Sequence, residues 1–410
     1  MNLPSISSRL QAVEEVRALQ RDWVKRTRQS VAAGGPFAIC NGDEAEELFI
    51  AMDIPVLAIN YWNYLILAQR KQARMNAILQ AEGYPGAHFF GFALAASLSP
   101  EDAPWGGLPT PTIICGSSRN EMETRVCELW AAKLGCANFT MDFSFPSPPF
   151  RPLPREWWQH LEHNWEAMVD PARLDYRIAQ ERQLVARVEA ITGRRLTVTR
   201  LAQVMALINE QMSIWTRAQQ AIAAAPVCPV HIRDQISIYQ AMWHRGSPLG
   251  VDLITRYEEE IRQRVDEGIG AYENERFRLY YSVQTPPWHD EIETRYGAVT
   301  VCCSYTDIPG LYRRRFDPAD PLRALAARHM LLFDWGPYRI IDVARRHRCD
   351  AAIVVEPAMA NGVSLQQQIV EAAGIPYLAI PRPAGDAEIC DRIGAFIEQR
   401  LLNGRERHAV

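Results

Sequence analysis

Two basic side chains stand in stretches of the sequence that are otherwise apolar or aromatic. His88 lies in GAHFFGF, and Arg245 follows Trp243 and His244. Because imidazole changes its protonation state near neutral pH, His88 is predicted to be a catalytic acid–base group or a metal ligand. Arg245 is the second catalytic candidate, because a guanidinium can hold a phosphate or a carbonyl oxygen. The alternatives are a buried histidine with satisfied hydrogen bonds and an interface arginine paired with an acid.

The segment GSSRNEME places small polar side chains at the start of an expected helix. Free backbone N–H groups at a helix N-terminus attract anions, so this segment is predicted to bind a substrate. Its candidate residues are Ser117, Ser118, Arg119, Asn120 and Glu121. The glycine patterns of nucleotide-binding loops are absent, which gives little support to nucleotide binding. Simple capping of the helix by Ser118 or Asn120 is the alternative.

Further polar residues follow or flank expected strands. Glu47 and Asn60 flank the apolar run IPVLAI, and Tyr305 and Tyr312 lie in SYTDIPGLY, directly after another apolar run. Since open α/β sheets bind ligands at the carboxyl ends of their strands, Asn60 and Tyr305 are predicted to contact substrate. The alternatives are that the acidic stretch DEAEE around Glu47 is a solvated face, and that the tyrosines pack within a turn.

The chain contains nine cysteines but no C-x-x-C pair. They occupy positions 40, 115, 127, 136, 228, 302, 303, 349 and 390. We interpret them as reduced thiols packed in the core, with metal ligation by some of them as the alternative. Cys302 and Cys303 are adjacent on an expected strand and therefore point to opposite faces, which prevents them from sharing one metal ion. No zinc-ligand spacing, H-E-x-x-H motif or Ser-His-Asp signature occurs.

The composition is that of an ordinary globular protein of two or three domains. The 410 residues are 48% hydrophobic and 22% charged, with a net charge of −4. This charge gives no reason to expect nucleic acid or an anionic membrane as partner. The N-terminal stretch lacks the apolar region of a signal peptide, and the apolar runs are far shorter than the roughly 18–20 residues of a membrane helix. We therefore expect a cytoplasmic protein.

The order of expected elements predicts two α/β lobes around a helical segment. Apolar strand candidates alternate with helices, including one long helix over residues 64–82, in a first lobe spanning residues 31–150 after an N-terminal helix at 1–30. The proline-rich stretch FPSPPFRPLP, residues 145–154, is a linker or a rigid exit from the first lobe, and the middle segment, residues 151–272, carries helical periodicity almost throughout. Strand–helix alternation returns in residues 273–410 with RFRLYYSV, AVTVCCSY, DAAIVVEP and PYLAIPRP. The predicted fold is therefore two doubly wound, Rossmann-like parallel sheets flanking a helical middle.

Four stretches of this plan resemble the benzoyl-CoA reductase and 2-hydroxyacyl-CoA dehydratase family. They are HRGSPLGVDLITRYEEEIRQRVDEGIG, ENERFRLYYSVQTPPW, GAVTVCCSYTDIPGLYRRRFDPADPLRALA and EAAGIPYLAIPRP. The third is the most specific, and the resemblance extends over about residues 36–402. It implies an acyl-CoA substrate, a cleft between the lobes, and a four-iron four-sulfur cluster held there by cysteine thiolates. It also implies a homologous partner subunit and an ATP-hydrolysing activator that supplies electrons.

The ligand positions depart from the pattern that the resemblance implies. The positions aligned with cluster-ligating cysteines carry His88, Asn120 and Ala360, the last in PAMANG beside Asn361. Alanine cannot ligate iron, an asparagine amide is a poor ligand, and one histidine cannot hold a cubane. We therefore expect no four-iron four-sulfur cubane at this site and assign no metal ligand, while another metal or displaced cysteines remain the alternatives. We count Ala360 and Asn361 among the substrate-binding candidates.

Three functions are consistent with these observations. In the first, the chain is the cluster-free subunit of a heterodimeric or heterotetrameric acyl-CoA reductase or dehydratase, and it completes the acyl-CoA cleft beside a cysteine-complete subunit that carries the iron–sulfur cluster. In the second, it is an iron-independent acyl-CoA lyase, hydratase or isomerase. In the third, it is a non-catalytic scaffold subunit.

Overall fold

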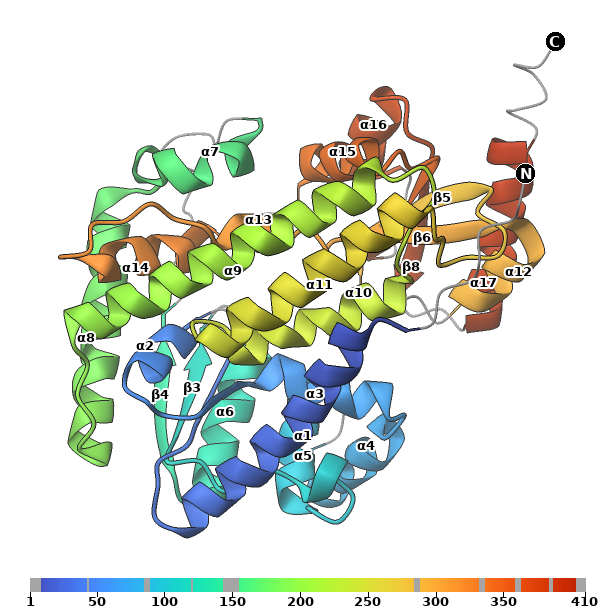
Figure 1. The fold of residues 1–410 in the computed structure, drawn as a ribbon. Coiled ribbons are helices and arrows are strands. Elements are labelled where there is room, and N and C mark those ends of the chain that lie inside the picture. Colours follow the sequence, from blue (N-terminus) through green and yellow to red (C-terminus); the bar gives the residue numbers. More distant parts are fainter. Residues whose placement is uncertain are drawn as a thin grey trace.

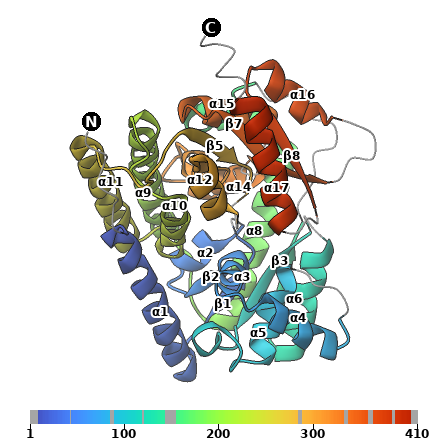
Figure 2. The same cartoon turned by 90° about the vertical axis from the view of Figure 1, so that its right-hand side faces the viewer.

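The computed structural model shows eight strands in two parallel sheets, with helices around and between them (Figure 1). It describes residues 9–42, 44–84, 89–118, 121–142, 155–283, 288–331, 336–357, 363–382 and 386–402. Figures 1 and 2 show the two sheets toward opposite ends of the molecule, with long helices packed along one side. The predicted fold class, two parallel α/β lobes flanking a helical middle, is confirmed.

The first sheet has the order β2-β1-β3-β4, and all of its strands are parallel. Its strands are β1 (Ala38–Cys40), β2 (Val56–Ala58), β3 (Ile113–Ser117) and β4 (Ala137–Met141). The helices connecting them are α2 (Glu46–Ala51), α3 (Ile59–Ala68), α4 (Gln72–Ala81), α5 (Phe92–Leu98) and α6 (Glu121–Leu134), with short 3₁₀ turns at Phe89–Gly91 and Pro104–Gly106. β1 and β3 are buried along their whole length, as expected for parallel strands covered on both faces. We call this sheet and its helices the first lobe.

The expected long helix over residues 64–82 is wrong, because two helices occupy this part of the chain. α3 ends at Ala68 and α4 begins at Gln72, and between them Arg70 has a φ of 55°. A left-handed residue cannot continue a right-handed helix, so the chain turns here although the apolar spacing runs through it.

The helical middle contains three long helices, α8, α9 and α11, whose N-termini are capped by side chains. Its elements are α7 (Trp157–Asn164), η3 (Trp165–Met168), α8 (Pro171–Thr192), α9 (Val198–Ala224), α10 (Ile232–Tyr239), η4 (Gln240–His244) and α11 (Pro248–Glu267). Asp170, Thr197 and Ser247 each accept a backbone N–H in the first turn of the helix that they precede. α9 and α11 lie side by side in both ribbon views (Figures 1 and 2).

The second sheet has the order β6-β5-β7-β8 and is also fully parallel. Its strands are β5 (Phe277–Tyr281), β6 (Ala298–Cys303), β7 (Ala351–Pro357) and β8 (Tyr377–Arg382). The helices of this second lobe are α12 (His289–Tyr296), α13 (Pro309–Tyr312), α14 (Pro321–Leu331), α15 (Pro337–Arg346), α16 (Leu365–Ala372), α17 (Asp386–Phe396) and the π-helical turn η5 (Ile397–Leu402). The four strands expected in this part of the sequence are all present.

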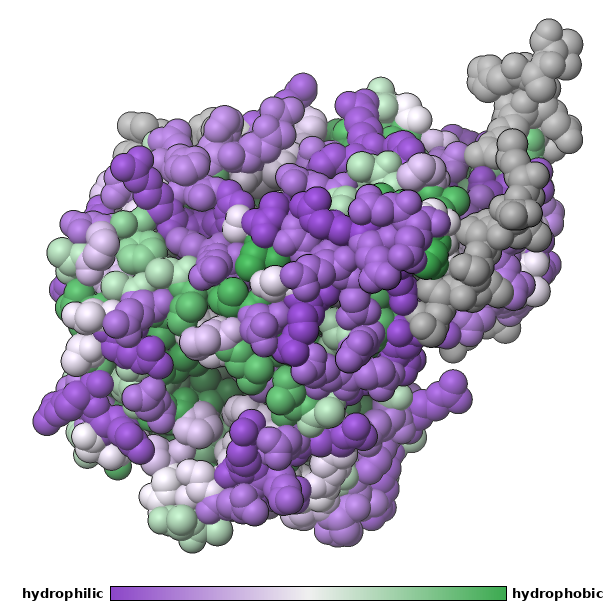
Figure 3. All heavy atoms as spheres, in the orientation of Figure 1, coloured by the Kyte–Doolittle hydropathy of each residue, from purple (hydrophilic) through white to green (hydrophobic). Residues whose placement is uncertain are grey.

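The surface in the orientation of Figure 1 is mainly hydrophilic. Figure 3 shows the broadest gathering of hydrophobic side chains on this face toward the first lobe, with smaller hydrophobic areas elsewhere. None of the helices in the described part of the chain is long and apolar enough to cross a lipid bilayer.

The N-terminal helix α1 (Gln11–Ala32) receives its cap from another helix. Leu10, the residue before α1, has no capping side chain. Instead, the carboxylate of Glu260 on α11 accepts the backbone N–H groups of Gln11 and Ala12 at 2.8 and 2.7 Å. These N–H groups have no partner within the helix, so Glu260 both satisfies them and fastens α1 to α11.

Replacing Glu260 by alanine should therefore loosen α1. We expect the Glu260→Ala variant to lose about 1 kcal/mol of unfolding free energy, the usual contribution of a helix cap. Urea unfolding and amide hydrogen exchange at Gln11 and Ala12 measure the effect. Glu259→Ala, at the exposed neighbouring position on α11, is the matched control. Equal exchange rates in the two variants would contradict this role of Glu260.

Candidate functional site

A network of buried charged side chains lies where the two lobes and the helical middle meet. It begins in the first lobe with Glu46 and Glu47, which form the first turn of α2 and are 4% and 0% exposed. The Glu46 carboxylate accepts the backbone N–H groups of Glu44 and Ala45 just before the helix. Acidic side chains in this position stabilise the positive end of the helix dipole. They are not a solvated acidic face, and that interpretation of DEAEE is wrong.

Arg245 joins both glutamates to the end of the helical middle. It follows η4, is 2% exposed, and places Nη2 at 2.5 Å from Glu46 Oε1 and Nε at 3.0 Å from Glu47 Oε1. Its Nη1 donates to the Tyr312 hydroxyl at 3.4 Å, and its guanidinium lies 5.5 Å from the centre of the Tyr312 ring. This is the acid-paired interface arginine that the sequence left open as an alternative; a direct role in catalysis stays a prediction.

The second lobe contributes Arg328 and His329 from α14. Arg328 Nη2 lies 2.6 Å from Glu47 Oε1, and the Arg328 guanidinium lies 5.2 Å from the Tyr312 ring centre. Tyr312 is therefore close to two guanidiniums, and the attraction between cations and an aromatic ring favours this arrangement. His329 contacts Glu47 Oε2 through Nε2 at 3.6 Å and Glu181 Oε1 through Nδ1 at 2.8 Å.

Helix α8 completes the network through Arg177 and Glu181. Their side chains form an ion pair at 3.0 Å, four residues apart on one face of the helix. Arg177 Nη2 also donates to the backbone carbonyl of Glu44 at 3.0 Å. All of these groups are nearly inaccessible to water. The network therefore connects α2, α8, η4 and α14, which are far apart in the sequence.

The protonation states of the network follow from its charges. Burial by itself raises the pKa of Glu47, but Arg245, Arg328 and His329 together lower it well below its ordinary value. The neighbouring Arg314 is fully buried, and burial together with the charge of Arg328 lowers its pKa to about 9. Glu47 is therefore a carboxylate at neutral pH, held in surroundings rich in positive charge.

A small pocket lies beside the network, between the first lobe and η4. Glu46 and Arg245 form its charged wall, and Tyr61, Met242 and Trp243 form much of its apolar wall. Ala58 at the end of β2 also lines it. The pocket thus combines one ion pair with an aromatic surface at the carboxyl end of a strand, where open α/β sheets bind their ligands.

Hydrogen bonds connect the strand ends to the network. Asn60, which follows β2, donates to Asn41 at 3.3 Å, and Asn41 donates to Glu44 at 3.3 Å. The Tyr305 hydroxyl, after β6, lies 3.2 Å from that of Tyr64 on α3, so this pair spans the two lobes. Two of the predicted site residues, Asn60 and Tyr305, are thus brought near the region where the lobes meet.

The other predicted residues divide into two groups. Ser117 is fully buried at the end of β3, Ser118 donates to Asp142 at 2.6 Å, and Glu121 begins α6 with its side chain 86% exposed. The structure therefore does not bring these three to the charged network. The predicted residues that lie outside the described part of the chain are His88, Arg119, Asn120, Ala360 and Asn361.

Three cysteines lie close together near the strand ends of the first sheet. Cys40 and Cys115 are paired neighbours on β1 and β3, and Cys127 lies close by on α6. Burial raises the pKa of all three thiols, as expected for cysteines packed as small apolar side chains. At the positions that the family resemblance aligns with cluster ligands, His88, Asn120 and Ala360 supply no sulfur, and these residue types do not fit an iron–sulfur cubane.

Residue-by-residue inspection of the sequence missed much of the network, including Glu46, Glu181, Arg177, Arg328 and His329. A signal was present in PLRALAARHMLL, where Arg328 and His329 stand between the apolar runs ALAA and MLL. Fully buried Arg and Glu residues occur almost only in pairs, so such an arginine predicts a buried acid. The identity of that acid depends on tertiary contacts.

Fold and site together define a two-lobed parallel α/β protein whose lobes meet over a buried ionic network. The model of the family described as 2-hydroxyglutaryl-CoA dehydratase, D-component, matches residues 45–399, and the chain belongs to this family. The resemblance found in the sequence is thereby confirmed. No significant match to a curated protein was found.

Glu47 should be required for the stability of the fold. We expect the Glu47→Gln variant to lose about 3–5 kcal/mol of unfolding free energy, because removing one member of a buried ionic group leaves the others uncompensated. Urea unfolding at pH 7 measures the loss. Glu121→Gln, an exposed glutamate in the first turn of α6, is the control and should change stability little.

The difference in unfolding free energy between wild type and Glu47→Gln should depend on pH in a defined direction. The folded-state pKa of Glu47 is lowered, so its contribution is present above its unfolded pKa of about 4.3 and is lost as pH falls through the folded value. The stability difference between wild type and Glu47→Gln should therefore be largest at neutral pH and shrink in acid. A difference that grows on acidification would contradict the assigned charge state.

Proposed function

We propose that this chain is the cluster-free subunit of a heteromeric 2-hydroxyacyl-CoA dehydratase-type enzyme. In this proposal it completes an acyl-CoA cleft beside a homologous, cysteine-complete subunit that carries the iron–sulfur cluster. The observation that carries the proposal is a retained two-lobed fold combined with a donor set unsuited to iron at the aligned ligand positions, His88, Asn120 and Ala360. Loss of ligands in one of two homologous subunits is compatible with activity when the other subunit retains them.

The chain's own residues would bind and position the substrate. The backbone N–H groups at the start of α6 would hold an anionic group of the CoA thioester, and Asn60 and Tyr305 would line the acyl side of the cleft. Because Arg245 already holds Glu46 and Glu47, we propose that it acts mainly as a positioning residue that fixes α2 and the wall of the small pocket. Electron supply by an ATP-dependent activator would be directed to the partner.

Iron analysis of the isolated chain tests the absence of a cluster. After anoxic purification, we expect substoichiometric iron and no broad absorption near about 400 nm, because the ligands of a cubane are missing. A cysteine-complete family member purified in the same way is the positive control. About four irons per chain, with that absorption, would overturn the cluster-free assignment.

Co-expression with a cysteine-complete family member from the same organism tests the subunit assignment. We expect a stable complex and an acyl-CoA turnover that requires both subunits, the activator, ATP and anoxic conditions. The isolated chain under air, without ATP or reductant, is the decisive comparison. Turnover by the chain alone would contradict the proposal and favour an iron-independent acyl-CoA lyase, hydratase or isomerase. A complex whose activity is unaffected by removing this chain would favour a scaffold.

A further inference from the structure

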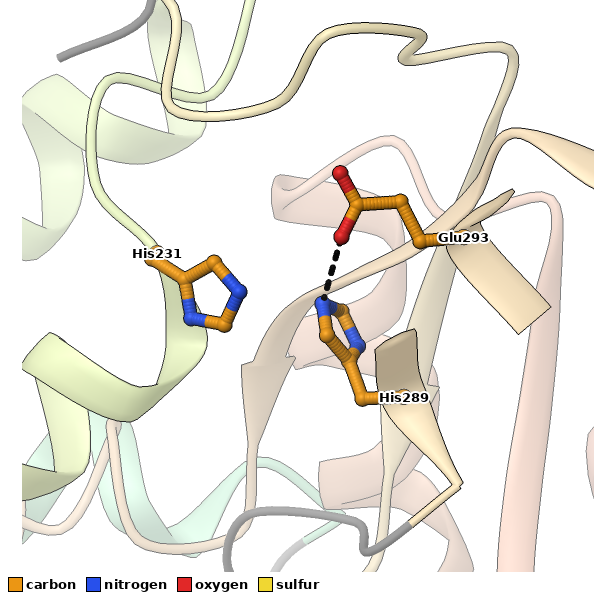
Figure 4. A group of neighbouring side chains, drawn as sticks. All are labelled: His231, His289 and Glu293. Atoms are coloured by element: carbon orange, nitrogen blue, oxygen red, sulfur yellow. Dashed lines mark ion pairs between the residues drawn. The ribbon is translucent and has the colours of Figure 1, made fainter. Parts of the chain in front are cut away.

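Away from the lobe junction, two histidines and a glutamate converge at the contact between α10 and α12. His231 is the residue before α10, His289 is the first residue of α12, and Glu293 lies one turn later on the same face of α12. One potential ligand atom from each residue lies within 4.8 Å of the other two. Figure 4 shows the two imidazole rings and the carboxylate facing a common space.

We propose that His231, His289 and Glu293 form a binding site for a divalent ion of the zinc type, which fastens α12 of the second lobe to the N-terminus of α10. Two imidazoles and one carboxylate are a ligand set that zinc accepts, with a fourth position left for water. The site is separate from the network around Glu47, and it does not depend on the proposed acyl-CoA function.

The spacing of two ligands already suits an ion. His289 Nε2 and Glu293 Oε2 are 3.5 Å apart. Tetrahedral ligands about 2.1 Å from zinc are separated by roughly 3.4 Å, so this pair needs almost no movement. His231 is half-buried, and its ligand atom lies within 4.8 Å of the other two, so it has to move closer for all three to bind one ion. The half-buried Glu293 leaves the site accessible to water.

The partners of His289 favour ligation through Nε2. Its ring is fully buried, and Nδ1 lies 3.4 Å from the Thr300 hydroxyl. An N–H at Nδ1 can donate to this oxygen, which leaves the lone pair of Nε2 directed at the shared space. Within the described residues, Nε2 makes no hydrogen bond, and the Glu293 carboxylate is its ionic contact. A buried polar atom of this kind normally has a partner, and an ion would supply it.

His231 already has a hydrogen-bond partner that opposes ion binding. Its Nδ1 accepts the Arg233 backbone N–H at 3.1 Å, and ligation through Nε2 puts a proton on Nδ1. The ion must therefore displace this cap, whose contribution corresponds to only about a fivefold change in an equilibrium constant.

The polar groups next to the site have partners of their own. The Tyr272 ring packs against both imidazoles, and its hydroxyl accepts the Ile232 N–H and donates to the Thr300 carbonyl. Arg233 forms an ion pair with Asp290 at 2.7 Å and thereby already links α10 to α12 at the surface. An ion between His231 and α12 would reinforce this link from beneath.

Metal titration of the full chain tests the site. We expect the chelator-treated wild type to bind one equivalent of Zn²⁺ in competition with a chelating dye. Glu293→Gln and His231→Gln should each bind at least about tenfold more weakly, because even the outer partners of metal ligands change affinity about 10–100-fold. Zn²⁺ should raise the melting temperature of the wild type but not of the variants. His163→Gln, an exposed histidine elsewhere, is the matched control.

Two further readouts distinguish this site from binding by cysteine. Co²⁺ substituted for zinc should show no thiolate-to-metal charge-transfer absorption, and zinc should accelerate amide exchange at Arg233 as the cap is displaced. Equal Zn²⁺ affinity in the wild type and both site variants would overturn the proposal, as would no binding at all, a thiolate band, or loss of binding in His163→Gln. If one site variant fails to fold, the other still decides the question.

Discussion

A carboxylate without access to water constrains how the parts of this protein fit together. Glu47 is fully buried, and an ionised group in such surroundings carries a desolvation cost of several kcal/mol unless cations reach it. Arg245 and Arg328 reach it from the end of the helical middle and from α14. Both cations are themselves buried, so each arrangement that separates them from Glu47 exposes an uncompensated charge. The network therefore acts mainly by favouring one arrangement of the two lobes over the alternatives. Its contribution to the net free energy of unfolding is the smaller effect.

The buried ionic network also fixes the position of the residues around the strand ends of the first sheet. Because Glu46 binds Arg245 and also accepts the backbone N–H groups of the two residues just before α2, the start of that helix is held against η4. The small pocket and the hydrogen-bonded pair Asn60–Asn41 lie next to this point. The part of the first lobe that would meet a ligand is therefore positioned by charges that a ligand need not touch.

Two cysteines of the first sheet are packed as apolar side chains. The thiols of Cys40 and Cys115 lie in the core, and burial raises their pKa values. The chain belongs to the family and has two parallel α/β lobes, and at the positions that the resemblance aligns with cluster ligands its sequence carries His88, Asn120 and Ala360. The chemistry of such a chain has to be read from its side chains, because the fold alone permits several activities.

The amino-acid sequence by itself determined the class of fold, because strand and helix periodicities are local. Runs such as RFRLYYSV and AVTVCCSY became buried parallel strands, and the family resemblance in GAVTVCCSYTDIPGLYRRRFDPADPLRALA was confirmed. The prediction from local sequence pattern was wrong around Arg70. The positive φ of this one residue divides the single helix that was expected there into two.

Tertiary structure alone decided which acids face which bases. Glu47 sits in an acidic stretch typical of a solvated surface, and only the approach of Arg245, Arg328 and His329 from distant segments makes its burial tolerable. Electrostatic pairing acts through space, so its partners are fixed by the packing of the lobes and not by their spacing along the chain.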